Sequence, residues 1–122
     1  MTGNDLFAQA LGMVGERAND SDLTCFAVGW INQLLAEALD VENSVLKFEG
    51  EEPFEHAPVL SAPGDEIPYS DRIVRYALPD GLAALLYEVS DDLNMAADYR
   101  ARYVAALREC AKLIPADVAD CY

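Results

Sequence analysis

The feature that most constrains the fold is a long stripe of apolar residues spaced by three and four in the first half of the chain. Residues at this spacing share one face of an α-helix. The stripe predicts one helix over residues 22–46, with an apolar face wide enough to pack against two other helices. Its members are Leu23, Phe26, Ala27, Trp30, Ile31, Leu34, Leu35, Ala38, Val41 and Val45.

Three further segments carry the same spacing over shorter stretches. Together with 52% hydrophobic residues, which is enough for one core in 122 residues, they predict a single mainly α domain spanning residues 1–122. We expect a four-helix up-and-down-like bundle. Pro79 should interrupt the third helix because proline removes a backbone donor, and Gly81 should permit a kink or a close approach. The other helices are expected at 3–18, 70–89 and 92–114, and the core around Trp30, Leu34, Leu78, Leu85, Tyr103 and Leu107.

Helix starts are predicted from residues whose side chains cap the free backbone N–H groups. Thr2 should cap the first helix, with Asp5 three residues later. Ser70 should cap the third helix, and Ser90 the fourth.

A proline-rich segment separates the second and third helices. Prolines recur every five residues from Pro53 to Pro68, which disfavours regular helix. We therefore expect an extended loop over residues 48–69 that could include a short β-hairpin. Since loops this long are usually functional or disordered, and this one carries apolar anchors, it is predicted to be an assembly loop held by neighbours rather than by its own domain. The predicted contacts to partner proteins are Phe48, Phe54, Val59, Leu60, Ile67, Tyr69 and Tyr122.

The charge of the chain restricts its partners. Twenty-two acidic residues face eight basic ones, for a formal net charge of −14. Binding to phosphate backbones needs clustered Lys and Arg, so nucleic acid and anionic lipid are disfavoured. A basic partner, or a surface that DNA passes without sticking, fits better, although such a charge also simply favours solubility. The basic residues of the fourth helix are expected to pair with acids of this chain or of a neighbour; they are Arg100, Arg102, Arg108 and Lys112.

The sequence carries no pattern typical of a catalytic, metal or cofactor site. The single histidine, His56, lies in the proline-rich segment and is interpreted as a surface residue. Cys25, Cys110 and Cys121 form no C-x-x-C pair, which favours a reducing cytoplasm, and no apolar run approaches the roughly 20 residues that span a bilayer. The chain is therefore predicted not to be an enzyme. The alternative is a small enzyme whose site forms around His56 only in three dimensions.

Three short motifs occur in order in the second half of the chain. Residues 65–71 read DEIPYSD, residues 76–83 read YALPDGLA, and residues 99–103 read YRARY. This pattern resembles the small head–tail connector (adaptor or head-completion) proteins of tailed bacteriophages and prophages. The order of helices, with a long second helix and an extended loop before two further helices, is similar over nearly the whole chain.

The resemblance implies a structural virion protein. Such a subunit would form a homo-oligomeric ring that docks on the portal protein, extends the DNA channel and offers a surface to the next neck or tail protein. DNA would pass without being bound specifically, no membrane would be involved, and the protein would lie in the virion neck after assembly in the host cytoplasm. The alternative is a small acidic bacterial regulatory or DNA-mimic protein that binds a basic protein partner.

Overall fold

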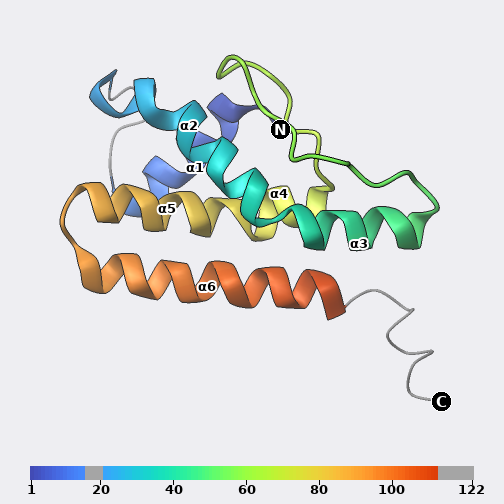
Figure 1. Ribbon diagram of the computed structural model, residues 1–122. Coiled ribbons are helices and arrows are strands. Elements are labelled where there is room, and N and C mark those ends of the chain that lie inside the picture. Colours follow the sequence, from blue (N-terminus) through green and yellow to red (C-terminus); the bar gives the residue numbers. More distant parts are fainter. Residues whose placement is uncertain (16–20, 113–122) are drawn as a thin grey trace.

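The chain folds into helices connected by one long loop (Figure 1). The computed structural model describes residues 1–15 and 21–112, with the side chains of residues 1–15 and 26–111. The predicted mainly α fold is confirmed. The possible β-hairpin is not found, because residues 51–70 form no strand and make only an isolated bridge from Glu66 to Thr2. The helices are α1 (Gly3–Val14), α2 (Ser21–Glu37), α3 (Leu39–Glu49), α4 (Asp71–Tyr76), α5 (Leu78–Val89) and α6 (Leu93–Lys112).

Helix α1 begins and ends as its sequence dictates. The Thr2 hydroxyl accepts the Asp5 N–H, and the Asp5 carboxylate accepts the Thr2 N–H, so the predicted capping box is confirmed. The helix ends at Gly15, whose φ of 80° is a left-handed conformation that glycine adopts without strain. The last predicted residues of this helix, 16–18, lie outside the described residues.

The predicted long helix over residues 22–46 is two helices, α2 and α3, that meet at Ala38. The Ala38 N–H and carbonyl still make helical hydrogen bonds, but the φ and ψ of Ala38, −91° and 1°, bend the helix axis at this residue. No proline or glycine marks this position. The bend lets each half follow a different partner, since α2 packs on α1 and α5 whereas α3 packs on α6. Tertiary packing therefore explains the break.

The predicted third helix is also divided, into α4 and α5 at Ala77. Pro79 lies in the first turn of α5, where its missing N–H is not needed, so the predicted interruption is confirmed. The Ser70 hydroxyl makes no capping bond to α4, contrary to prediction. Ser90 closes α5 instead of opening α6, and the Asp92 carboxylate caps α6 by accepting the Met95 N–H at 3.2 Å.

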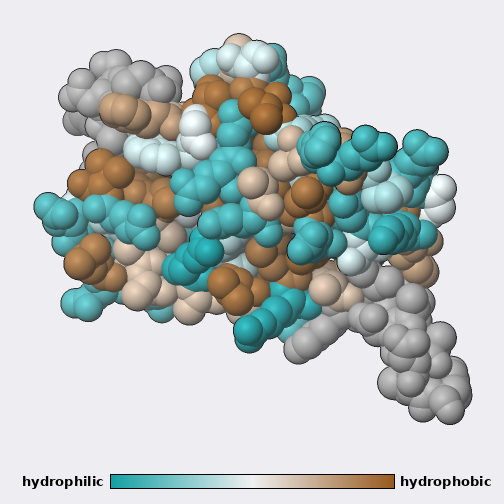
Figure 2. All heavy atoms as spheres, in the orientation of Figure 1, coloured by the Kyte–Doolittle hydropathy of each residue, from teal (hydrophilic) through white to brown (hydrophobic). Residues whose placement is uncertain are grey.

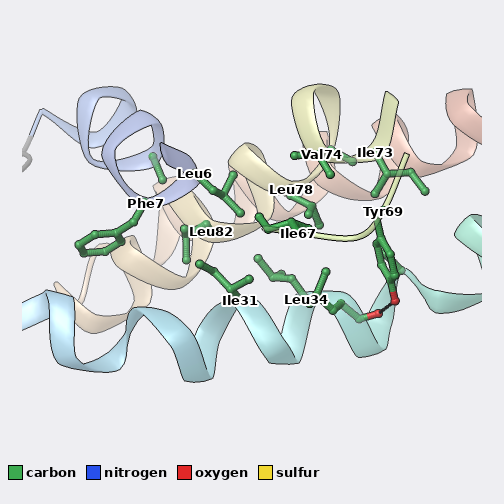
Figure 3. Close-up of a cluster of buried hydrophobic side chains, with 14 of the residues drawn as sticks. Leu6, Phe7, Ile31, Leu34, Ile67, Tyr69, Ile73, Val74, Leu78 and Leu82 are labelled. Carbon is green, nitrogen blue, oxygen red and sulfur yellow. Dashed lines mark hydrogen bonds between the residues drawn. The ribbon is translucent and has the colours of Figure 1, made fainter. Parts of the chain in front are cut away.

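Helices α5 and α6 form an antiparallel pair, α1 lies on α5, and α2 crosses α5 obliquely (Figure 1). With two of the four expected helices broken, the up-and-down bundle is not confirmed in its simple form. The core lies between these helices (Figure 3). Of the six predicted core residues, Leu34, Leu78 and Tyr103 are fully buried, whereas Trp30, Leu85 and Leu107 pack partly exposed at its edge.

Gly81 is a point of close approach in this core. A Cβ atom there would lie 2.9 Å from Leu34 Cδ2 and 3.0 Å from Tyr103 Cδ1. Only a residue without a side chain lets α2 and α6 approach α5 this closely, so the predicted close approach is confirmed.

Candidate functional site

Two asparagines on consecutive helices hold the backbone of the long loop. Asn32 on α2 donates to the Leu60 carbonyl at 3.2 Å and accepts the Leu60 N–H at 2.7 Å. Asn43 on α3 pairs with Phe54 in the same way, at 3.0 Å and 2.8 Å. Each side-chain amide binds one backbone N–H and one backbone carbonyl of the loop. It thereby supplies the hydrogen bonds that a neighbouring β-strand would otherwise provide.

The loop is also tied to the start of α1. The Gly3 N–H donates to the Asp65 carbonyl at 3.1 Å, the Asn4 N–H to the Pro63 carbonyl at 2.7 Å, and Ile67 N–H to the Met1 carbonyl at 3.0 Å. These donors include N–H groups of the first helical turn, which have no partner inside the helix. The start of the chain and the end of the loop, which are distant in sequence, are thereby fixed side by side.

A buried carboxylate secures the end of the loop. Glu42 on α3 is 1% exposed, and both of its oxygens lie 3.0 Å from the Ser70 nitrogen. Burial raises the pKa of the Glu42 carboxyl above its ordinary value, although the Ser70 hydrogen bond opposes this rise. Beside it, the Tyr69 hydroxyl donates to the Leu35 carbonyl at 2.5 Å (Figure 3). Burial raises the Tyr69 pKa, so this hydroxyl keeps its proton.

In the single subunit that the structure describes, these contacts fold the loop back on its own helices. The role of residues 48–69 in assembly stays a prediction. Leu60, Ile67 and Tyr69 are buried in the core of their own subunit, so in this conformation they present little surface to a partner. Phe48 and Val59 remain exposed, at 50% and 73%, and stay predicted contacts. Phe54 is partly buried against Tyr69, with ring centroids 5.8 Å apart. Tyr122 lies outside the described residues.

His56 is the single histidine of the chain and lies in the long loop. The residue is exposed on the loop, and in residues 1–15 and 21–112 no three His, Cys, Asp or Glu side chains gather in a way that could hold a metal ion. Cys110 is a buried free thiol whose pKa burial raises, which disfavours the reactive thiolate. The side chain of Cys25 and all of Cys121 lie outside the described residues.

A cavity of about 390 Å³ opens between α4 and α6, and mostly apolar atoms line it. Tyr76 of α4 stands at this cavity and is 69% exposed, whereas Cys110 of α6 is buried at it. Arg72 also lines the cavity. In the part of the chain that the structure describes, no ion pair involves Arg72 or Arg75 of α4. The five residues that line the cavity are Arg72, Tyr76, Ala106, Glu109 and Cys110.

The turn between α5 and α6 presents apolar side chains among acids. Val89 and Leu93 are 53% and 69% exposed. Asp91 between them has a φ of 59°, the left-handed region that aspartate tolerates better than most residues. We call residues 88–93 the hairpin tip; its acids are Glu88, Asp91 and Asp92, and it contains no base.

Two of the basic residues of α6 are paired within the chain, as predicted. Arg100 contacts Glu37 of α2 at 2.8 Å and lies 5.1 Å from the centre of the Tyr103 ring. Arg102 contacts Asp98 at 3.0 Å and lies over Tyr99. These cations are engaged by their own subunit, which weakens the case for a nucleic-acid surface on this helix.

No family model, curated protein or solved structure matches this chain. No helix among the described residues is both long and apolar enough to cross a bilayer. A proposal about function must therefore rest on the surfaces described above.

Proposed function

We propose that this chain is a structural subunit of a phage or prophage head–tail connector. In this proposal the subunits form a ring that docks on the portal, extends the DNA channel and receives a downstream neck or tail protein. The protein acts by binding other subunits and performs no catalysis. It resides in the host cytoplasm before assembly and in the virion neck afterwards.

One observation carries the proposal: large apolar side chains are exposed in several separate places. They come from α2, α3, the long loop, α4 and the hairpin tip, and Figure 2 shows hydrophobic patches separated by hydrophilic surface. Exposed apolar patches commonly mark contacts with other proteins. A ring subunit has a neighbour on each side, a portal above and a tail component below, so it needs several such contacts. The exposed residues are Phe26, Phe48, Val59, Tyr76, Val89 and Leu93.

The charge of the chain supports the same proposal. A net charge of −14 repels the phosphate backbone, so a channel built from such subunits would let DNA pass without holding it. The loop fits as well, since its attachment to α1, α2 and α3 gives a rigid surface on which Val59 is displayed.

The test is co-expression with the portal protein encoded in the same gene cluster. A complex purified through a tag on the portal should contain this chain in a fixed ratio, and electron microscopy should show a ring at one end of the portal. A portal that purifies without this chain, or a gene cluster with no portal and capsid genes, would overturn the proposal. Val59→Asp should reduce the amount bound, whereas Gln33→Glu, an exposed site on α2, should not.

A DNA-mimic protein is the second candidate, and one observation favours it. Glu49, Glu51, Glu52 and Glu55 are all exposed on the end of α3 and the start of the loop. Such a row of carboxylates could occupy the basic site of a nucleic-acid-binding protein. This candidate predicts a stable monomer or dimer that competes with DNA for that partner. Failure to compete in a DNA-displacement assay, together with ring formation on a portal, would exclude it.

A further inference from the structure

The two ends of α6 carry different surfaces, an acidic tip with exposed apolar side chains and an apolar cavity with Arg72 in its lining. The hairpin tip lies at the start of α6 (Figure 1). The α4–α6 cavity is lined by residues from the second half of α6. Leu93 at the tip and Cys110 at the cavity are 17 residues apart, or about 26 Å along a helix. The tip projects apolar side chains, whereas the cavity is a hollow that could accept side chains. The two surfaces lie towards opposite ends of one subunit.

The cavity has room for the side chains that the tip exposes. A cavity of about 150 Å³ lined by aliphatic side chains accepts a benzene molecule. The 390 Å³ between α4 and α6 therefore has room for two aliphatic side chains, such as those of Val89 and Leu93. Burying both would remove the two most exposed apolar groups of the hairpin tip from water.

The charges around the two surfaces are opposite. Glu88, Asp91 and Asp92 surround the apolar residues of the tip. Arg72 lines the cavity, and Arg75 lies three residues further along the same face of α4. Glu109 also lines the cavity, so the acidic tip is attracted mainly by its α4 side. In a protein with a net charge of −14, the arginines of α4 offer an acidic tip a favourable electrostatic contact.

We propose that copies of this chain associate head to tail, with the hairpin tip of one copy in the α4–α6 cavity of the next. Val89 and Leu93 enter the cavity beside Tyr76, and the tip carboxylates face Arg72 and Arg75. A contact between two different surfaces leaves one of each free at the ends, so further copies can add. The assembly becomes a ring where the rotation between copies closes, and an open filament where it does not. The head-to-tail contact stands independently of the proposed connector function. Only the expectation that the assembly closes into a ring rests on that function.

The test uses two variants that each lack one surface. Leu93→Asp removes the tip, and the double variant Arg72→Glu/Tyr76→Asp removes the cavity side; all three positions are exposed, so both proteins should fold. Gln33→Glu, at an exposed polar site on α2 outside the apolar contacts, is the control. Sedimentation is measured over a wide concentration range at about 0.15 M salt, where screening within about 8 Å weakens the repulsion between whole subunits more than it weakens the direct contacts.

The head-to-tail contact predicts a specific result. Wild type and Gln33→Glu should form species larger than dimers, and each surface variant alone should remain monomeric. A mixture of the two surface variants should form a one-to-one dimer and nothing larger, because one intact tip meets one intact cavity. A wild type that stops at a dimer, or a mixture that stays monomeric while wild type assembles, would overturn the contact.

A cysteine pair separates this inference from the proposed function. Tyr76→Cys and Leu93→Cys are introduced into a chain whose three native cysteines are replaced by alanine, and disulfide formation is tested alone and on the portal. A ladder of cross-linked subunits supports the head-to-tail contact. A portal complex that binds the chain but gives no ladder overturns the contact and leaves the connector function supported. A ladder in the free protein without portal binding supports the contact and counts against the connector function.

Discussion

The side-chain amide of Asn32 satisfies both backbone groups of Leu60, donating to the carbonyl at 3.2 Å and accepting the N–H at 2.7 Å. Leu60 is 5% exposed, so neither backbone group could easily turn to water instead. Without Asn32 the loop would have to leave the core or keep unpaired groups inside it.

Replacing this amide should therefore destabilise the fold. Asn32→Ala leaves a donor and an acceptor of the Leu60 backbone unpaired. At about 1–3 kcal/mol for each buried group, we expect a loss of about 2–6 kcal/mol in the free energy of unfolding. Gln33→Ala, the exposed neighbour on α2, should change stability by less than about 0.5 kcal/mol. Urea melts measure both values. Equal melts for the two variants would mean that the amide does not hold the loop.

Adjacent loop residues should behave in opposite ways. Leu60→Ser should cost at least the roughly 2–5 kcal/mol of a buried leucine truncation, because Leu60 packs in the core. Val59→Ser, at a side chain 73% exposed, should change stability by less than about 0.5 kcal/mol. Thermal or urea unfolding of the free protein distinguishes them. Comparable losses at both positions would contradict the described burial of the loop.

Replacing a helical glycine by alanine should change the stability of the protein in opposite directions at two positions, Gly81 and Gly12. Gly81→Ala places a methyl group against Leu34 and Tyr103, both buried, and should cost about 1–3 kcal/mol through overpacking. Gly12→Ala on α1 meets nothing within 4 Å and should stabilise by up to about 1 kcal/mol through helix propensity. Denaturant midpoints give both signs. A stabilised Gly81→Ala would show that the helices need not approach so closely.

Glu42 should make stability depend on pH in an unusual direction. Because burial raises its pKa in the fold, the folded protein keeps a proton that the unfolded chain loses above about pH 4.3. Stability should therefore increase as pH falls towards that value, and Glu42→Gln should abolish this contribution while leaving stability near pH 7 unchanged or higher. The measurement is the difference in unfolding free energy between wild type and Glu42→Gln at several pH values, which cancels the general repulsion among acids.

A leucine at position 42 tests the hydrogen bond to the Ser70 N–H separately from the charge of Glu42. Glu42→Leu removes the carboxylate and also leaves the Ser70 N–H without its partner, so it should be less stable than Glu42→Gln by about 1–3 kcal/mol at every pH. A difference between wild type and Glu42→Gln that does not change with pH would show that Glu42 carries the same charge in both states.

The protein should not bind DNA. With a net charge of −14, and with Arg100 and Arg102 paired inside the subunit, no complex is expected in a gel shift at low salt, where non-specific attraction is strongest. A basic protein of similar size serves as the positive control. A shifted band for this chain would contradict the proposed role of its acidic surface in a DNA channel.

Much of the fold could be predicted because local rules determine it. The apolar spacing placed the helical segments, the capping box at Thr2 placed the start of α1, and Pro79 placed the break before α5. Burial within the loop could not be predicted, because an apolar residue such as Leu60 suits a core and an interface equally well. A signal for Glu42 was present, since it lies four residues after Ala38 and three before Val45, on the apolar face of the helix.

The sequence by itself determined that this chain is helical, strongly acidic and interrupted by a proline-rich loop, because spacing, charge and proline act locally and need no partner. Only the tertiary structure decided that the helix over residues 22–46 bends at Ala38, that Asn32 and Asn43 hold the loop, and that Trp30 lies at the edge of the core. The physical reason is that burial and hydrogen-bond partners depend on which distant elements meet. The same dependence places an acidic apolar tip and an arginine-bordered cavity at opposite ends of one subunit.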